Sequence, residues 1–172
     1  MKLLDTSVII LFADFIFDWN CISHLYDIGE DLNTTPEVHQ EYYQKSEAWM
    51  SEDLVKLFIN QNKLKVLDIN LTNSKDNFKN RFPKLNDGEL SILSLGSLLK
   101  SENKSYYCVL DDKHARNAAK SMNLNLTGSI GMIEKIKFSN IWNDQELENI
   151  VNDINQSPFF VSEEILRVLI NE

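Results

Sequence analysis

The chain has 172 residues, 43% of them hydrophobic, and a formal net charge of −9 at pH 7. This length and composition predict one globular domain, and the negative charge argues against a protein that coats nucleic acid. No run approaches the roughly 18 apolar residues of a membrane span. Cys21 and Cys108 stand in apolar segments, so we expect a cytoplasmic protein with reduced thiols and no membrane partner.

The spacing of apolar residues, with Pro, Asn and Asp near the ends of segments, predicts alternating helices and strands. We expect helices over residues 6–11, 19–28, 36–45, 54–59, 73–82, 86–102, 112–122, 129–138, 144–154 and 162–170. We expect strands over residues 2–4, 32–35, 64–69, 106–110 and 124–128. Short apolar strands that alternate with helices are typical of a parallel sheet covered on both faces, so the predicted fold class is α/β.

Acidic residues stand at the ends of the predicted strands and at the starts of helices. Asp5 follows the first strand, and the adjacent Asp111 and Asp112 follow the fourth. Glu89 opens the helix before the fourth strand, and Glu41 lies on the helix after the second. The functional crevice of a parallel sheet lies beyond the carboxyl ends of its strands. We therefore expect one carboxylate cluster, although each acid also has a structural interpretation as a helix cap or first-turn acid.

The predicted cluster has the chemistry of a metal site. Carboxylates that share one crevice do not all stay ionised unless a cation lies nearby. The histidines lack the spacing of a zinc site, and oxygen donors are the ligands that Mg²⁺ and Mn²⁺ prefer. Such ions often serve phosphate chemistry. A receiver domain or a dehalogenase-like phosphatase fits less well, because the acidic pair comes late and Ser7 stands where such a phosphatase has its second Asp.

Three segments together resemble the PIN domain. They are LLDTSVII (3–10), LNDGELSILSLG (85–96) and VLDDKHARNAAKSMNLNLTGSIGMI (109–133). Within that family they are similar to the VapC-like toxin branch, which has a GE helix, an lDDxxAR junction and a TGxxG turn. FFVSEEIL near the C-terminus matches the joint between the last two helices of that branch. The resemblance therefore covers 1–172 as a single PIN-like domain, with 142–172 as a C-terminal helical extension.

The resemblance implies a three-layer α/β/α sandwich with a mostly parallel sheet, and Mg²⁺- or Mn²⁺-dependent hydrolysis of RNA phosphodiester bonds. Its catalytic acids would be Asp5, Glu41, Glu89 and Asp112, and its metal ligands Asp5, Glu89, Asp111 and Asp112. Glu37 competes with Glu41, and one of Asp111 and Asp112 is expected to point inward while the other caps the next helix. The candidates for RNA contact are Thr6, Ser7, Arg116 and Ser129. The branch also implies a small antitoxin protein as partner, and a homodimer.

Two of these candidates have alternatives that the sequence leaves open. Arg116 is one helical turn after Asp112, so it forms either an ion pair with that acid or a contact to an RNA phosphate. Gly128 and Gly131 flank Ser129 at a strand-to-helix turn, where they serve either anion binding by backbone amides or tight packing alone. For the whole chain, the alternative function is an inactive PIN-like module that binds a protein partner or RNA without cutting it.

Overall fold

The computed structural model describes residues 1–46, 52–159 and 161–170. They form one sheet of five parallel strands in the order β3-β2-β1-β4-β5. The strands are β1 (Lys2–Leu4), β2 (Leu32–Thr34), β3 (Lys65–Val66), β4 (Tyr107–Val109) and β5 (Leu126–Thr127). The register pairs Leu3 of β1 with Asn33 on one side and with Cys108 on the other. β1 is therefore the central strand, and Asp5 follows it directly at the carboxyl edge of the sheet.

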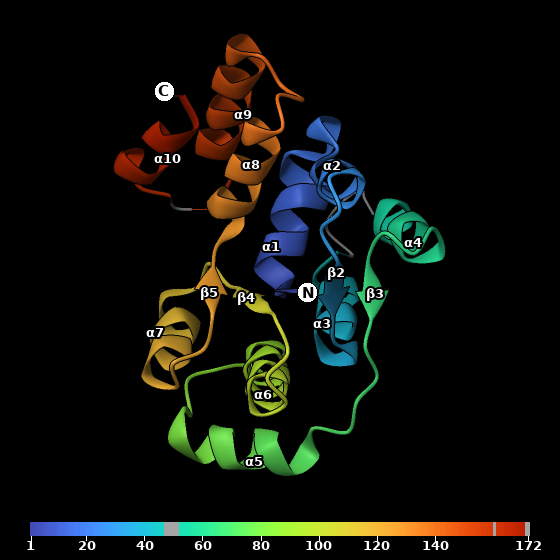
Figure 1. Cartoon of the computed structure of the whole chain (residues 1–172), viewed down its shortest axis with the longest axis vertical. Coiled ribbons are helices and arrows are strands. Elements are labelled where there is room, and N and C mark those ends of the chain that lie inside the picture. The colour runs from blue at the N-terminus through green and yellow to red at the C-terminus, as the bar shows by residue number, and fades with distance from the viewer. Residues whose placement is uncertain (47–51, 160, 171–172) are drawn as a thin grey trace.

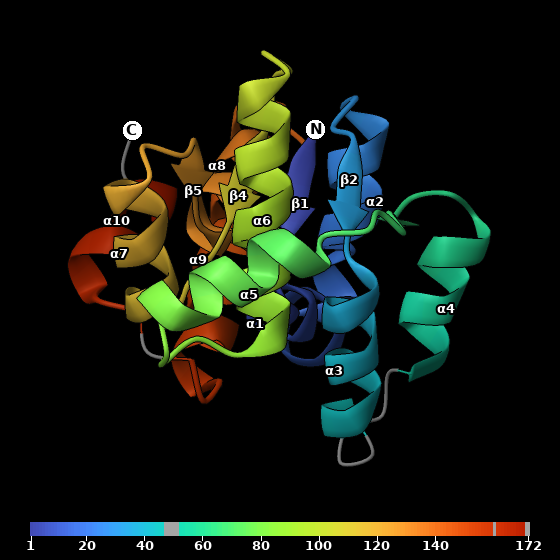
Figure 2. The same cartoon turned by 90° about the horizontal axis from the view of Figure 1, so that it is seen from below.

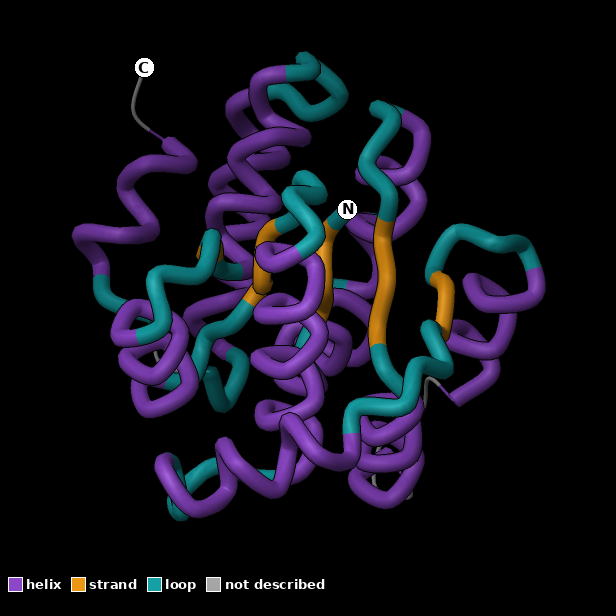
Figure 3. The backbone as a smooth tube through the Cα atoms, turned by 60° about the horizontal axis from the view of Figure 1, so that its bottom comes forward, coloured by secondary structure: helices purple, strands orange, loops and turns teal. Residues whose placement is uncertain are grey.

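Helices cover both faces of this sheet. They are α1 (Thr6–Ile10), α2 (Cys21–Asp27), α3 (Pro36–Ser46), α4 (Glu52–Asn60), α5 (Thr72–Arg81), α6 (Asp87–Ser101), α7 (Lys113–Ser121), α8 (Ser129–Phe138), α9 (Asp144–Gln156) and α10 (Glu163–Ile170). α6, with α5 crossing it, lies on one face, and α2, α8 and α9 lie on the other (Figures 1 and 2). Figure 3 shows the strands enclosed between helical layers. The predicted three-layer α/β/α sandwich is confirmed.

The two edge strands are shorter than the sequence predicts. Instead of 64–69 and 124–128, the paired residues are those of β3 and β5 alone. β3 pairs only with β2, and β5 pairs only with β4, within the described residues. A strand with one neighbour has hydrogen bonds to the sheet on one side only, so its ends leave the sheet where that single pairing stops.

The starts of two helices differ in their caps. In α1, Asp5 occupies the N-cap position, and its side chain makes no capping bond within the described residues. That helix also continues beyond α1 as a π-helical segment, η1 (Leu11–Phe15). In α6, by contrast, Asn86 is the N-cap and forms a full capping box with the residue three positions on. The capping box therefore fixes the position of Glu89, whereas no capping bond holds the side chain of Asp5.

One apolar core connects the two ends of the chain. Leu3 of β1 belongs to the same buried cluster as Ile150 of α9 and Leu166 of α10. The last two helices therefore pack on the core that also supports the carboxyl edge of the sheet. Within the described residues, no helix alone has the length and apolar character to cross a membrane, and only Thr6–Phe15 and Phe17–Asp27 together, bent by 87°, meet that test.

Candidate metal centre

Asp5 is the most deeply buried acid at the carboxyl edge of the sheet. Its side chain is 3% exposed, and its Oδ2 accepts a hydrogen bond from the Ser7 hydroxyl at 3.1 Å. Its Oδ1 is buried and has no hydrogen-bond partner among the described residues. Burial, with the nearby charges of Glu89 and Glu41, raises the pKa of Asp5 to about 7, against the opposing hydrogen bonds of Thr6 and Ser7. The buried oxygen of Asp5 is therefore a free ligand position.

Glu41 reaches the same place from α3. Its Oε2 accepts a hydrogen bond from the Thr6 hydroxyl at 2.8 Å. Its Oε1 accepts hydrogen bonds from Lys45 Nζ at 2.5 Å and from Asn86 Nδ2 at 3.3 Å. Glu37, the alternative second acid, instead forms an ion pair with Lys75 of α5. Glu41 is therefore the acid of α3 that lies beside Asp5, and Thr6 acts as a positioning residue for it.

Glu89 is held at the N-terminus of α6 by the capping box. Its Oε2 accepts a hydrogen bond from the Asn86 amide at 2.9 Å, and its own amide donates to Asn86 Oδ1 at 2.8 Å. Its side chain is buried, and burial is the main cause that raises its pKa. The charges of Asp112 and Glu41 raise that pKa further, while the Asn86 amide and Lys45 oppose the shift. Glu89 therefore lies within electrostatic reach of the acids from α3 and from the end of β4.

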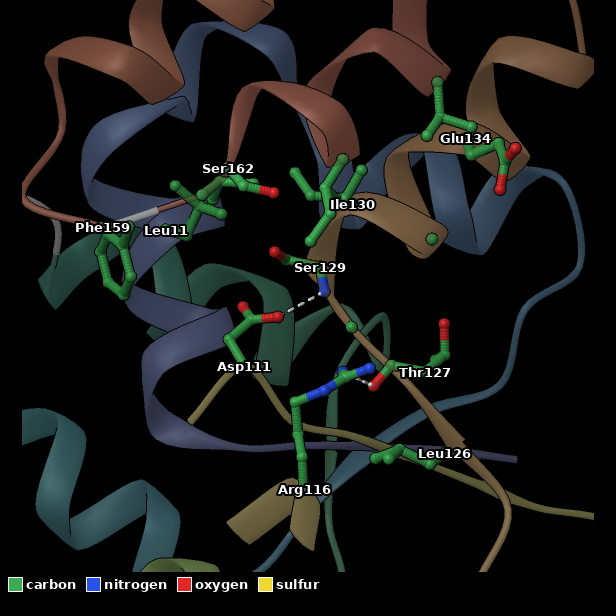
Figure 4. Close-up of a pocket in the computed structure, with 15 residues that line it drawn as sticks. Leu11, Asp111, Arg116, Leu126, Thr127, Ser129, Ile130, Glu134, Phe159 and Ser162 are labelled. Carbon is green, nitrogen blue, oxygen red and sulfur yellow. Dashed lines mark hydrogen bonds between the residues drawn. The ribbon is translucent and has the colours of Figure 1, made fainter. Parts of the chain in front are cut away.

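The adjacent acids after β4 face different partners. Asp112 is the N-cap of α7, and its Oδ1 accepts hydrogen bonds from the amides of His114 at 2.6 Å and Ala115 at 2.9 Å. Asp111 turns to the other side, where its Oδ1 accepts a hydrogen bond from the Ser129 amide at 2.9 Å (Figure 4). The charge of Asp112 helps to raise the pKa of Glu89, whereas Asp111 bonds to Ser129, so Asp112 is the member of the pair that lies near Glu89.

Arg116 and Ser129 have structural partners on the far side of β4. Arg116 Nη1 donates hydrogen bonds to the carbonyl oxygens of Leu110 at 2.7 Å and Thr127 at 3.1 Å, which ties the ends of β4 and β5 together. The anion at the Ser129 amide is Asp111 itself. Burial raises the pKa of Asp111, and the hydrogen bonds of Ser129 and the charge of Arg116 oppose that shift.

The absence of a side chain at Gly128 lets Asp111 and Arg116 lie close to the turn. A Cβ at Gly128 would lie 2.8 Å from Asp111 Oδ1 and 3.0 Å from Arg116 Nη1. These residues line a cavity of about 510 Å³ whose opposite wall includes Leu11 and Phe159 (Figure 4). The turn at Gly128 therefore serves packing around a half-buried acid, which is the structural alternative that the sequence left open.

The four remaining acids, Asp5, Glu41, Glu89 and Asp112, come together from β1, α3, α6 and the end of β4. The charges of Glu89 and Glu41 act on Asp5, and those of Asp112 and Glu41 act on Glu89. Within the described residues, however, no three His, Cys, Asp or Glu side chains converge as a ready set of metal ligands. All four acids accept hydrogen bonds from neighbouring amides, hydroxyls or a lysine, and among these four only Asp5 has a buried oxygen without a partner in the described residues.

A family model described as a PIN domain matches residues 1–172. The chain belongs to the PIN-domain family. No curated protein and no solved structure matches the chain significantly. PIN domains are generally nucleases and typically use divalent metal ions, so the family assigns a nuclease-type function to this fold.

The acids of this PIN domain fit a divalent metal ion by their chemistry. The unpartnered, buried Asp5 Oδ1 is an oxygen that a hard cation would satisfy. Three further carboxylates lie nearby, and neither of the two cysteines belongs to the site, because Cys21 and Cys108 are buried in the apolar core. Asp5, Glu89 and Asp112 are the residues that would hold the ion, with Glu41 as the fourth acid.

Two residues that position the site were missed in the sequence. Asn86 contacts both Glu41 and Glu89, and Lys45 binds Glu41 from the next turn of α3. The signals were present, since Asn86 and Glu89 have the spacing of a capping box and Glu41 and Lys45 have the i,i+4 spacing of a helical ion pair. Neither spacing indicates a site by itself, because both are common on helices that have no functional site.

Gly88→Ala is expected to reduce nuclease activity by about tenfold or more, because small displacements of catalytic groups are costly. An added Cβ would collide with Glu41 Oε2 and come within 3.3 Å of Val38, so Glu41 must move. We expect a change in the free energy of unfolding within about 1 kcal/mol, since alanine favours a helix and the Glu41 side chain can give way. Cleavage assays and thermal melts measure both effects.

Gly96→Ala in the same helix is the matched control. Its Cβ would lie 2.7 Å from Cys108 Sγ and 3.3 Å from Tyr106, inside the core. This variant is expected to lower Tm while the folded fraction keeps its rate of cleavage. A Gly88→Ala protein with unchanged activity would show that the position of Glu41 does not matter.

Proposed function

We propose that this PIN domain is a Mg²⁺- or Mn²⁺-dependent endoribonuclease that acts as the toxin of a toxin–antitoxin pair. The observation that carries the proposal is the buried Asp5 carboxylate, whose Oδ1 has no described partner and whose neighbours are Glu41 and Glu89. This group lies beyond the carboxyl end of the central strand, where parallel sheets place their functional sites. Acids without a thiol or imidazole among them favour hard cations, which serve phosphate chemistry.

The side chains have distinct tasks in this proposal. Asp5, Glu89 and Asp112 would hold the metal ion, which when bound would activate water and stabilise the leaving oxygen. Thr6 and Lys45 fix Glu41 through their hydrogen bonds to its two oxygens. Asn86 orients Glu89 through the capping box. Asp5 must lose its proton to act as a ligand, so the assembly of the site depends on pH around neutrality.

The proposal extends to location and partners. Cys21 and Cys108 are free and buried, which agrees with a reducing cytoplasmic compartment. Ile165, Val168 and Ile170 of α10 are partly exposed apolar residues, and they offer contact area to an antitoxin protein or to a second copy of the chain in a homodimer. Size measurements on the purified chain, alone and with the product of a neighbouring short reading frame, test both partners.

A second candidate function is an inactive PIN module that binds RNA or a protein without cutting. The observation that favours it is that no three ligand side chains converge among the described residues. In such a module, Glu89 and Asp112 would serve only as helix-capping residues. No interaction would then offset the cost of burying the Asp5 carboxylate.

RNA cleavage by the purified protein decides between the two. The wild type is assayed with Mg²⁺, with Mn²⁺ and with chelator, beside Glu89→Gln and Glu102→Gln. Glutamine keeps the capping box of α6, so Glu89→Gln removes the charge alone and is expected to reduce cleavage by about 100-fold or more. Glu102 lies at the other end of α6 and pairs with Lys104, so its variant is expected to cut normally. Cleavage that persists in chelator, or that Glu89→Gln leaves intact, contradicts the proposal.

A further inference from the structure

Unpaired cations gather in one region of this acidic chain. Most lysine and arginine side chains of the described residues have an acidic or carbonyl partner, as Lys65 has in Asp31 and Lys100 has in Met122. The side chains with no ion pair and no hydrogen bond among the described residues are Arg81, Lys84, Lys113 and Lys120. All are exposed. In a chain with a net charge of −9, such a grouping indicates a surface for a negatively charged ligand.

Two of these cations, Arg81 and Lys84, line a groove between the end of α5 and α7, and the other two, Lys113 and Lys120, lie on α7. The groove has a volume of about 330 Å³ and is lined by Arg81, Phe82 and Lys84 on one side and by His114, Asn117 and Ser121 on the other. None of its lining residues is acidic. Figures 1 and 2 both show the C-terminal end of α5 beside α7. We call this feature the α5–α7 groove.

Two lysines of α7 lie beside the groove without lining it. Lys113, Asn117 and Lys120 recur at helical spacing, so both lysines lie on the same side of α7 as the lining residue Asn117. They are about 10 Å apart along the helix axis. Their charges therefore extend along α7, the helix that forms one wall of the groove.

One end of the α5–α7 groove meets the carboxylate site. On the α7 wall, the amide of the lining residue His114 donates a hydrogen bond to Asp112 Oδ1 at 2.6 Å. On the opposite wall, Leu85 lines the groove and directly precedes Asn86, which contacts Glu41 and Glu89. A ligand that follows the groove therefore arrives between Asp112 and Glu89.

The α5–α7 groove also contains an aromatic ring. The guanidinium of Arg81 lies 4.9 Å from the centroid of the Phe82 ring, and Phe82 lines the groove while it stays partly exposed. Cationic grooves with aromatic side chains bind single-stranded nucleic acid, because the cations track phosphates and the rings stack on bases. Double-stranded RNA is recognised differently, by shape across a wide minor groove.

We infer that the α5–α7 groove binds single-stranded RNA and leads its backbone to the carboxylates. This inference rests on the proposed nuclease function and adds the conformation and path of the substrate. Lys84, Lys113 and Lys120 contact phosphates, and the Arg81–Phe82 pair stacks on a base. The groove thus explains how a chain with a large negative charge holds a polyanion beside a cluster of acids.

Fluorescence anisotropy with a labelled single-stranded RNA of about 12 nucleotides tests the inference, since such proteins commonly cover a site of similar size. The measurements are made in chelator, so that binding is recorded without cleavage. Lys84→Gln with Lys113→Gln is compared with Lys65→Gln with Lys104→Gln, which removes the same charge from exposed lysines that lie outside the groove. Phe82→Leu tests stacking.

The groove double variant is expected to bind about tenfold more weakly at low salt, with the salt slope reduced by about 1.4, whereas the control double variant stays within about twofold of wild type. Phe82→Leu is expected to bind about tenfold more weakly with an unchanged salt slope. Equal losses in the two double variants would show an effect of net charge and overturn the inference. Competition by poly-glutamate as strong as that by RNA of equal charge would also overturn it, in favour of an acidic protein ligand.

Parallel cleavage assays in Mg²⁺ separate this inference from the nuclease proposal. If the wild type cuts RNA and the groove double variant binds as tightly as wild type, the path is wrong and the nuclease stands. If the wild type binds through the groove but does not cut in Mg²⁺ or Mn²⁺, the groove stands and the chain is a binding module.

Discussion

Asp5→Asn is expected to make the metal-free protein more stable at pH 8, while it abolishes the stabilisation by metal and reduces RNA cleavage by about 100-fold or more. The reason lies in the burial of Asp5, which raises its pKa from near 3.8 to about 7. A charged carboxylate in this place is unfavourable without a cation, and a neutral amide of the same shape avoids that cost. The same substitution removes the oxygen charge that a divalent ion needs.

The raised pKa of Asp5 also determines how the free energy of unfolding changes with pH. Between about pH 4 and pH 7 the folded protein holds a proton on Asp5 that the unfolded chain has released. The free energy of unfolding therefore decreases as the pH rises through this window, by an upper limit of about 4 kcal/mol from this group. Above pH 7 the difference is constant, so the advantage of Asp5→Asn in chelator should grow from pH 4 to pH 7 and then level off.

Chemical denaturation in chelator at a series of pH values measures this effect, and thermal melts with added Mg²⁺ measure the metal response. Asp68→Asn is the control, because Asp68 is an exposed aspartate that is not one of the four acids of the site. Metal affinity of the wild type should increase up to about pH 7, since the ligand is the ionised form of Asp5. An Asp5→Asn protein with the same rise in Tm on adding Mg²⁺ as the wild type would show that Asp5 is not a ligand.

The fold and the place of the acids could be predicted from the sequence because both depend on local patterns. Short apolar strands that alternate with helices specify a parallel sheet, and the ends of its strands fix where Asp5 and Asp112 lie. The lengths of β3 and β5 could not be predicted, because an edge strand depends on a single neighbour that is distant in the chain. The residue pattern of a segment indicates that it can form a strand. It does not indicate over how many residues a neighbouring strand pairs with it.

The finer assignments at the site depend on contacts between distant segments. Glu37 and Glu41 are one helical turn apart on α3, and they are distinguished by Lys75 of α5, which pairs with Glu37. The partners of Arg116 are backbone carbonyl oxygens at two strand ends, and the sequence carries no signal for them. Only the assembled sheet brings these groups together.

Asp112→Asn is expected to reduce RNA cleavage by about 100-fold or more, whereas Asp111→Asn is expected to keep most of the activity. Asparagine caps a helix as well as aspartate does, so Asp112→Asn retains the N-cap of α7 and loses only the charge that faces Glu89. At Asp111, the amide oxygen of asparagine can still accept the hydrogen bond from Ser129. Both variants should therefore fold, which makes the comparison one of charge alone.

The stability of the two variants checks that premise. Asp111→Asn loses the attraction of Arg116. It also avoids the cost of burying a charged carboxylate, which is the effect that raises the pKa of Asp111. These effects oppose each other, so we expect a change in the free energy of unfolding of about 1 kcal/mol or less in either variant. Cleavage rates in Mg²⁺ and the metal-induced rise in Tm then report the site itself. A larger loss in Asp111→Asn, or equal losses in both, would place Asp111 at the metal and contradict the division of roles between the two neighbouring acids.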